Sequence, residues 1–305
     1  MTDRLMLLDT ASLYFRAFYG VPDTVKAPDG RSVNAARGLL DMIAKLVTTY
    51  EPRHLVACWD DDWRPQWRVD LIPSYKAHRV VEVVVGSPDV EEVPDPLEAQ
   101  IPVIRAELDA LGIPVVGVAA HEADDVIASF AAQSTLPVDV VTGDRDLFQL
   151  VDDERGVRVI YTGKGMSNLE ILDEAAVVAK YAVLPAQYAD FAVLRGDASD
   201  GLPGVAGIGE KTAASLLREH GDLTGIRAAA TSGTGMTAGV RAKIVAAADY
   251  LDVAPQVVEV VRTLELPVAP SRLHAPDAAT ISSLAEMWGL GASLDRAVAA
   301  ITARA

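Results

Sequence analysis

Val138–Asp146 reads VDVVTGDRD. Its valines form a short β-branched run that is typical of a buried strand, and Gly143 ends that strand. Asp144 and Asp146 follow two residues apart, so in an extended backbone their carboxylates point the same way. Carboxylates at the carboxyl end of a strand lie where open α/β sheets bind their ligands. A turn with a helix-capping Asp explains this stretch equally well when it is taken alone, so the rest of the chain decides.

The same pattern of an acid after a strand recurs along the chain. Apolar runs predict buried strands over residues 5–8, 55–59 and 115–118, followed by carboxylates or by a helix that begins with them. Acids in a first helical turn complement the helix dipole, but the three in HEADD exceed what capping needs. Alternating strands and helices predict an α/β fold with a mostly parallel central sheet flanked by helices, so these acids should converge at one sheet edge. They are Asp9, Asp60, Glu122, Asp124, Asp144 and Asp146, with Asp125 beside Asp124.

Such a cluster of acids points to metal ions. Neighbouring carboxylates repel one another strongly unless cations hold them. Hard oxygen ligands without Cys or His partners select Mg²⁺ or Mn²⁺ over zinc. Two such ions about 4 Å apart form the clamp used for in-line phosphodiester hydrolysis, where one activates the water and the other stabilises the leaving oxygen. The sheet edge is therefore predicted to be a metal-dependent phosphoryl-transfer site.

Composition restricts the class of protein further. The chain has 305 residues, half of them apolar, which favours a folded protein with a real core. Its formal net charge of −16 argues against a simple basic-patch nucleic-acid binder. A single cysteine, Cys58, excludes an internal disulfide framework. The N-terminal residues do not resemble a signal peptide and no apolar run approaches a membrane span, so we expect a cytoplasmic protein without membrane contact.

Residues 63–79, WRPQWRVDLIPSYKAHR, contain the densest mixture of cations and aromatics in this acidic chain. Such a mixture suits phosphates and stacked bases. A surface helix with half-buried aromatic side chains is the alternative. Residues 80–96 are apolar, then acidic, then rich in proline, and we expect a mobile excursion between two helices there. The cations of the segment are Arg64, Arg68, Lys76, His78 and Arg79.

The second half of the chain is predicted to be mainly helical, over residues 169–181, 185–194, 240–251, 257–264 and 281–302. Asp197 and Asp200, three residues apart, can extend the acidic cluster. Residues 204–209, GVAGIG, form a Gly-rich hairpin, and the next residues open a helix whose backbone N–H groups can bind a phosphate. The glycine spacing and the missing strand exclude a Walker loop and a GxGxxG dinucleotide site. What remains is a helix-hairpin-helix that grips a DNA backbone without reading bases.

Together these motifs resemble the 5′-nuclease family, which includes flap endonucleases and the 5′→3′ exonuclease domain of bacterial DNA polymerase I. The resemblance runs in the family's order from Asp9 to about Ala213 and continues more weakly to about Val268. No polymerase domain follows, so the chain resembles a stand-alone member. The matching motifs are LLDT around Asp9, WD at Asp60, YKAHR, EADD, TGDRDL, GDASD and GVAGIGEKTA.

The resemblance implies roles for individual residues. One metal site would use Asp60, Glu122 and Asp124, the second would use Asp144, Asp146 and Asp197, and Asp9, Asp125 and Asp200 would bind or support the ions. Lys76 and Arg79 match the cations at the base of a helical arch, which contact the scissile phosphate. The hairpin matches the family's duplex-binding element, whose carbonyls hold K⁺. The residues expected to contact DNA are Arg16, Arg64, Arg68, Gly207, Gly209, Lys211 and Thr212.

The sequence departs from the family pattern at three places. The family commonly has Asn where this chain has Gly201, after the last acidic motif. Asp60 is followed by two more acids, so a register slip would make Asp61 the ligand. The arch region is longer than in polymerase I and carries few basic residues.

The resulting prediction is a structure-specific DNA 5′-nuclease that uses two or more Mg²⁺ or Mn²⁺ ions and acts as a monomer on 5′ flaps, nicks and single-stranded 5′ ends. Residues 1–182 would form the catalytic domain, with the arch at about 68–96. Residues 183–305 would form the helical DNA-binding region, with the hairpin motif at about 202–219. The alternatives are a non-catalytic junction-binding relative and an aspartate-nucleophile phosphatase, for which LLDTAS lacks the second Asp two residues later.

Overall fold

The computed structural model describes residues 3–24, 26–84 and 87–305, and its centre is a six-stranded sheet. The strand order is β5-β2-β1-β6-β7-β8, and all neighbours pair in parallel except β7 and β8. The predicted mostly parallel α/β fold is confirmed. The sequence analysis assigned no element to residues 157–161, which form a fifth parallel strand. The strands are β1 Leu5–Asp9, β2 His54–Cys58, β5 Val115–Val116, β6 Val138–Thr142, β7 Val157–Tyr161 and β8 Glu170–Leu172.

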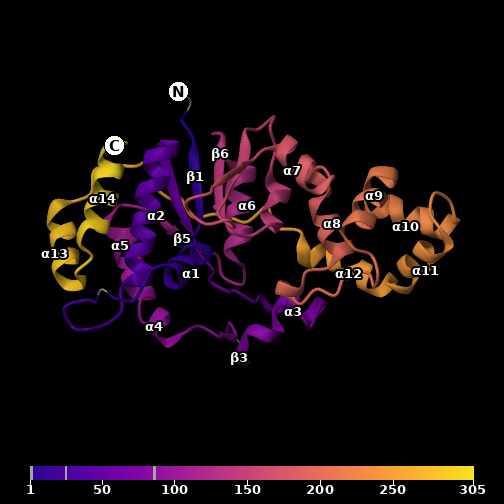
Figure 1. The fold of residues 1–305 in the computed structure, drawn as a ribbon, viewed down its shortest axis with the longest axis horizontal. Coiled ribbons are helices and arrows are strands. Elements are labelled where there is room, and N and C mark those ends of the chain that lie inside the picture. Colours follow the sequence, from indigo (N-terminus) through magenta and orange to yellow (C-terminus); the bar gives the residue numbers. More distant parts are fainter. Residues whose placement is uncertain (1–2, 25, 85–86) are drawn as a thin grey trace.

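Both faces of this sheet are covered, because side chains along its central strands alternate between two cores. In β1, Leu5 and Leu7 belong to one core, whereas Met6 and Leu8 belong to the other. Figure 1 shows the helices on either side of the sheet. The first core contains side chains of α6 Ala123–Gln133, η2 Asp146–Leu150, α7 Glu174–Tyr181 and α8 Tyr188–Arg195. The second contains side chains of α1 Thr10–Gly20, α2 Asn34–Tyr50 and α5 Ile101–Ala110.

A helical region extends from the sheet on the α8 side (Figure 1). Its helices after α8 are amphipathic and bury leucines and alanines against one another. Two 3₁₀ turns, η3 Pro185–Gln187 and η4 Ala198–Asp200, flank α8. The remaining helices of this region are α9 Glu210–His220, α10 Leu223–Ser232, α11 Ala238–Ala246 and α12 Ala248–Val258.

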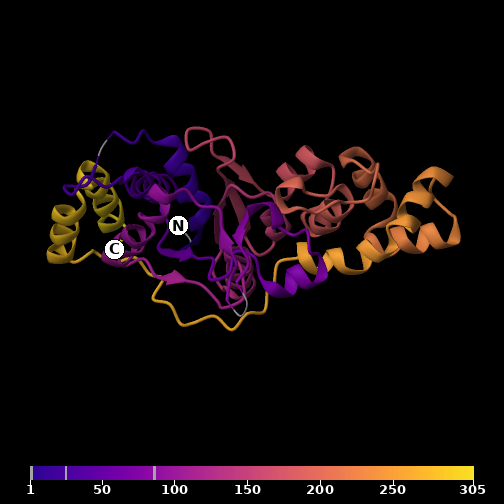
Figure 2. The ribbon, with the colours of Figure 1, turned by 90° about the horizontal axis from the view of Figure 1, so that it is seen from below.

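After α12 the chain runs back along the molecule in an extended strap, residues 259–277 (Figure 2). The sequence analysis predicted a helix over 257–264, which is wrong beyond Val258. Side chains of the sheet domain replace the helical hydrogen bonds there: Val260 N donates to Gln149 Oε1 at 3.2 Å and Leu264 N donates to Ser129 Oγ at 3.1 Å. These bonds fix the strap in an extended form.

The strap leads to two C-terminal helices, α13 Ala278–Trp288 and α14 Gly291–Thr302. They pack against the sheet domain on the side away from the other helices of the second half (Figure 1). Leu294 and Ile301 of α14 are fully or almost fully buried in the same core as α2. The sequence analysis placed these residues in the helical DNA-binding region, whereas in the structure they pack on helices of the sheet domain.

The predicted arch region is helical only in part. It begins with α3 Gln66–Leu71 and a 3₁₀ turn, η1 Ala77–Arg79, and ends with α4 Asp95–Glu98. Between them β3 Val80–Glu82 and β4 Val90–Glu91 pair as a two-stranded antiparallel ribbon. The helical arch predicted there is therefore wrong for these two segments. Val85 and Gly86, which belong to the same predicted excursion, lie outside the described residues.

Within the three described stretches, the helices are too short or too polar for any one of them to cross a lipid bilayer.

Candidate active site

A cavity of about 340 Å³ opens at the carboxyl ends of the central strands. Asp9 ends β1, Asp60 and Asp144 follow β2 and β6, and Glu122 and Asp124 begin α6. Lys76, Arg79 and Glu91 complete the charged lining. The parallel strands explain this gathering, because their carboxyl ends all meet at one edge. The structure thus brings together five of the predicted acids and both predicted phosphate-contacting cations.

A second, much smaller cavity of about 10 Å³ lies next to the first, room for about one water molecule. It shares Glu122 and Asp124 with the larger cavity and adds Asp146 and Asp200. Arg68 also lines it. Seven of the nine predicted acids therefore line one or both of two adjoining cavities.

Asp9 and Asp60 are fixed by short hydrogen bonds. Asp9 accepts from Thr142 Oγ1 at 2.6 Å and from Ser12 N at 3.2 Å, which ties the ends of β1 and β6 together. Asp60 Oδ1 accepts from Ala123 N at 2.8 Å, at the first turn of α6. Burial raises the pKa of Asp9 to about 7 and that of Asp60 to about 6, although these hydrogen bonds oppose the shift. Both carboxyls are thus costly to ionise without a cation nearby.

The two oxygens of Glu122 have different partners. Oε1 accepts from Tyr75 Oη at 2.7 Å and from Arg68 Nη1 at 3.0 Å. Oε2 is paired with the Lys76 ammonium. Burial alone would lower the pKa of Lys76, but the charge and hydrogen bond of Glu122, together with the charges of Tyr75 and Asp200, raise that pKa well above its usual value.

Asp124 and Asp146 are the acids that most need a cation. Burial and the neighbouring Asp144 raise the pKa of each well above the usual range. Oδ1 of Asp146 is buried and has no hydrogen-bond partner among residues 3–24, 26–84 and 87–305. Within the same residues, no group of three or more Asp, Glu, His or Cys side chains could hold a metal ion as they stand in this structure. The oxygen donors and the unpartnered carboxylate oxygen fit hard divalent ions.

Two predicted acids lie outside both cavities. Asp125 is fully buried and binds Arg68 through both oxygens at 2.8 Å. Asp197 pairs with Arg195 at 3.1 Å and Arg145 at 3.5 Å. Burial would raise the pKa of Asp197, but hydrogen bonds from Ser199 and the two arginines lower it. In this structure both acids form ion pairs and do not line the cavities.

The uncertainty between Asp60 and Asp61 has a structural answer. Asp61 lines a different hollow, together with Asp62 and Gln66, whereas Asp60 lines the acidic cavity. Gly117 packs against the Asp61 carboxylate, so a Cβ there would lie 2.4 Å from Asp61 Cγ. The motif is therefore in the expected register, with Asp60 at the site.

Two of the predicted DNA contacts are corrected. Arg64 and Arg68 are only 7% and 2% exposed. Arg64 pairs with Asp89 at 2.5 Å, and Arg68 pairs with Glu122 and Asp125. Buried guanidinium groups with carboxylate partners cannot reach a phosphate backbone, so both arginines belong to the protein interior.

The other predicted DNA contacts lie at accessible positions. Arg16 lines a hollow of about 650 Å³ that shares Ser12 and Phe15 with the acidic cavity. In the hairpin, Leu202, Val205 and Ile208 are buried, which turns the glycine backbone outward. The residues on that outer side are Gly207, Gly209 and Lys211, all exposed, and the half-buried Thr212.

Sequence reasoning missed Thr142 and Tyr75. Thr142 binds Asp9 and accepts from Asp144 N at 2.8 Å, so one hydroxyl orders two acids. The signal that could have identified Thr142 is its position directly before the Gly-Asp turn. Tyr75 was seen only as an aromatic, and its hydroxyl binds Glu122.

Protein-family models and named relatives match most of this chain. Residues 4–182 match the family described as 5′-3′ exonuclease, N-terminal resolvase-like domain, and residues 183–280 match its C-terminal SAM fold. A 5′-3′ exonuclease of Streptomyces coelicolor is 61% identical over 98% of this chain and 100% of its own length. A 5′-3′ exonuclease of Mycobacterium tuberculosis is 49% identical over 97% of both chains. DNA polymerase I of Mycobacterium bovis is 44% identical over 72% of this chain and 23% of its own length.

Solved structures share the fold at low sequence identity. T5 5′-exonuclease with bound zinc has a TM-score of 0.66 at 18% identity and covers 98% of both chains. The catalytic core of Rad2 in complex with DNA has a TM-score of 0.60 at 17% identity, covering 100% of this chain and 93% of that one.

Proposed function

The chain belongs to the 5′-3′ exonuclease family, and on that premise we propose that it is a structure-specific DNA 5′-nuclease of replication and repair. It hydrolyses phosphodiester bonds at 5′ flaps and junctions and degrades DNA from 5′ ends. The observation that carries this proposal is the acidic cavity at the strand ends, where five buried or half-buried carboxylates face two cations. Neighbouring acids in such number exceed what helix capping and ion pairing require, and they suit divalent ions that bind a phosphodiester.

The residues that would hold Mg²⁺ or Mn²⁺ are those that line the two cavities. When bound, such ions activate a water molecule and stabilise the leaving oxygen. Asp125 and Asp197 would support the site through their arginines and not by direct contact. Lys76 and Arg79 would hold the scissile phosphate. The lining acids are Asp9, Asp60, Glu122, Asp124, Asp144, Asp146 and Asp200.

Lys76 and Arg79 have the position for this role, because both line the acidic cavity. Arg79 is one-third exposed and reaches Asp200 at 3.2 Å, and Lys76 contacts Glu122 inside the cavity. A phosphate that enters the cavity would therefore meet both cations. Electrostatic groups that meet developing charge contribute about 10²–10³ in rate. We therefore propose that Lys76 and Arg79 mainly raise the rate of cleavage and contribute less to the affinity for DNA.

The hairpin at the start of α9 would bind DNA at a place separate from the cavity. Gly209 caps that helix, and the exposed backbone around it offers N–H groups to a phosphate. Gly207 O already accepts from the Lys243 ammonium at 2.9 Å, so the K⁺ ion that the resemblance implies would have to use other carbonyls of the hairpin. In this assignment residues 1–182 form the catalytic domain and 183–258 the DNA-binding region, and the protein acts as a monomer on flaps, nicks and single-stranded 5′ ends.

A non-catalytic junction-binding relative is the competing function. A 5′-labelled flap duplex incubated with Mg²⁺, Mn²⁺ or chelator, with the products sized on a gel, separates the two. We expect short labelled products from the flap and a nicked or shortened duplex with either ion, and intact substrate in chelator. Retarded but uncut flap DNA under all conditions would favour the binding protein.

A further inference from the structure

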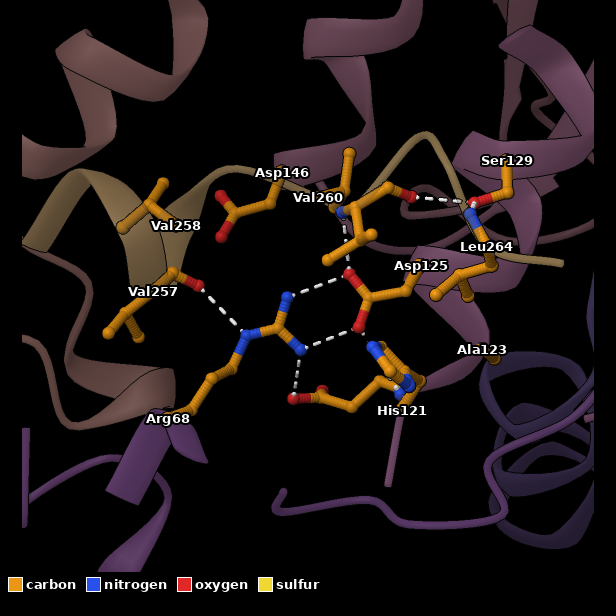
Figure 3. Close-up of polar contacts among 12 residues, drawn as sticks. Arg68, His121, Ala123, Asp125, Ser129, Asp146, Val257, Val258, Val260 and Leu264 are labelled. Atoms are coloured by element: carbon orange, nitrogen blue, oxygen red, sulfur yellow. Dashed lines mark hydrogen bonds and ion pairs between the residues drawn. The ribbon is translucent and has the colours of Figure 1, made fainter. Parts of the chain in front are cut away.

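Arg68 joins three segments that are far apart in the sequence (Figure 3). It lies in α3, and its guanidinium donates to Glu122 Oε1 at 3.0 Å and to both oxygens of Asp125 at 2.8 Å. Its Nε donates to Val257 O at 3.1 Å, at the end of α12. The side chain is 3% exposed, so this network is shielded from bulk solvent.

Asp125 extends the network to the strap. Its Oδ1 also accepts from Val261 N at 2.8 Å, so the carboxylate links the first turn of α6 to the residues after α12 (Figure 3). Arg68 and Asp125 together therefore hold the end of the helical region against the helix that begins with Glu122 and carries Asp124.

Stability alone explains this network poorly. Buried ion pairs lose most of their mutual attraction to desolvation, and apolar residues often replace them without loss of stability. Their better-attested benefit is a fixed geometry. Here the geometry concerns Glu122: Arg68 and Tyr75 hold Oε1 on the interior side, which leaves Oε2 to the cavity where Lys76 meets it.

We propose that Arg68 is a positioning residue that sets Glu122 and the first turn of α6 for divalent-ion binding and ties that turn to the end of α12. The proposal rests on the proposed function, since it presumes that the acidic cavities bind divalent ions. Only the planar fork of an arginine can bind two oxygens of Asp125 and one of Glu122 together, and a lysine keeps the charge without the fork.

The test compares Arg68→Lys with Arg158→Lys. Arg158 is a matched control, because its guanidinium also binds both oxygens of a fully buried carboxylate, Asp139, and neither residue lines an acidic cavity. Mn²⁺ alone is titrated into each protein without DNA and followed by calorimetry or by the spectrum of the free ion. Thermal unfolding of each protein in chelator is recorded alongside.

We expect Arg68→Lys to weaken Mn²⁺ binding by about 10–100-fold, the effect of removing a partner that orients a metal ligand. Arg158→Lys should keep the wild-type Mn²⁺ affinity even if its unfolding temperature falls as far. Unchanged Mn²⁺ affinity in Arg68→Lys, or an equal loss in both variants, would reduce Arg68 to a structural residue.

Asp125→Asn is the second variant and decides the matter if Arg68→Lys does not fold. Asp125→Asn removes the negative charge that the Arg68 guanidinium binds, and it should also weaken Mn²⁺ binding. The double variant should then lose no more affinity than the worse single variant, because both changes break one unit. Wild-type affinity in Asp125→Asn, or additive losses, would contradict the proposal. A wild-type protein that binds no Mn²⁺ would overturn the proposed function as well, and these failures are therefore distinguishable.

Discussion

Asp146 and Asp197 have carboxylates whose pKa values are shifted in opposite directions. Asp146 has a buried, unpartnered Oδ1 among the described residues, and its pKa is raised by burial and by Asp144. Asp197 accepts hydrogen bonds from Ser199 and pairs with two arginines, and its pKa is lowered. The ionised carboxylate of Asp146 therefore destabilises the metal-free fold, whereas that of Asp197 stabilises it.

We predict that Asp146→Asn raises and Asp197→Asn lowers the unfolding free energy of the metal-free protein. A neutral amide at 146 costs less to bury than a carboxylate, and we expect a gain of about 1 kcal/mol. The amide at 197 leaves two arginines without their partner and should cost about 1–3 kcal/mol. Urea unfolding in chelator near neutral pH measures both. A loss of stability in Asp146→Asn would show that its carboxylate is not strained by repulsion.

Glu107 of α5 is a buried acid with no part in the proposed site. It is 0% exposed, and neither carboxylate oxygen has a hydrogen-bond partner in the part of the chain that the structure describes. Burial raises its pKa well above the ordinary 4.5. The folded chain therefore holds this proton at pH values where the unfolded chain has released it, and stability falls as pH rises above about 4.5.

Glu107→Gln should remove the loss of stability that accompanies the rise in pH. We predict that the variant is more stable than the wild type at neutral pH and no more stable at pH values below the ordinary glutamate pKa. Unfolding free energy measured across this pH range gives the result. Asp109→Asn, an exposed position of the same helix, is the control and should change stability by less than about 0.5 kcal/mol. Parallel pH curves for wild type and Glu107→Gln would contradict the argument.

At the scale of elements, the turn after η4 packs directly on the segment that presents Lys76. Ser74 Oγ donates to Gly201 O at 2.8 Å, and Lys76 N donates to Asp200 O at 3.0 Å. Gly201 has φ +69°, and a Cβ there would lie 2.0 Å from Ser74 O. This approach leaves no room for a side chain at position 201 of this chain.

Gly201→Ala should therefore displace residues 74–76 and slow cleavage by at least about 10-fold, since small misplacements of positioning groups carry large costs in rate. Affinity for flap DNA in Ca²⁺ should change little. Single-turnover cleavage and a binding titration measure the two effects. Gly239→Ala is the control, because a Cβ at Gly239 meets no atom within 4 Å in the described structure. An unchanged rate in Gly201→Ala would mean that the turn does not position Lys76.

The sequence predicted the elements whose signal is local. The strands ending in acids were found because apolar runs and turn residues bound them, and η2 and α6 follow from the same motifs. The strap was missed because its hydrogen bonds go to Gln149 and Ser129, more than 100 residues away in sequence. The burial of Arg64 and Arg68 was missed for the same reason: their carboxylate partners lie 25 to 57 residues further on. Helix periodicity indicated α13 and α14 but could not show that α13 packs on α5 and α14 on α2.

At the scale of the whole molecule, a protein with a formal net charge of −16 has to bind a polyanion. Two divalent ions would offset about a quarter of that charge. Binding must then be local, at the hairpin and at the cations of the acidic cavity, so few phosphates are neutralised and the salt dependence of affinity should be shallow.

We predict that Ca²⁺ tightens flap-DNA binding relative to chelator, because the empty acidic cavity repels the scissile phosphate. Fluorescence anisotropy with a labelled flap measures this without cleavage. Lys211→Ala, on the exposed side of the hairpin, should weaken duplex binding and leave Mn²⁺ affinity unchanged. Equal DNA affinity in Ca²⁺ and in chelator would mean that the phosphate does not enter the cavity.

The central claim is that the two adjoining cavities form one metal-dependent nuclease site, and Asp124, which lines both, tests it most directly. The measurement is the single-turnover rate of 5′-flap cleavage by wild type and by Asp124→Asn, each in Mg²⁺ and in chelator, with folding checked by circular dichroism. We expect cleavage only by the wild type in Mg²⁺, with a loss of at least about 10²-fold in the folded variant. A wild-type rate in Asp124→Asn, or cleavage that persists in chelator, would contradict the account.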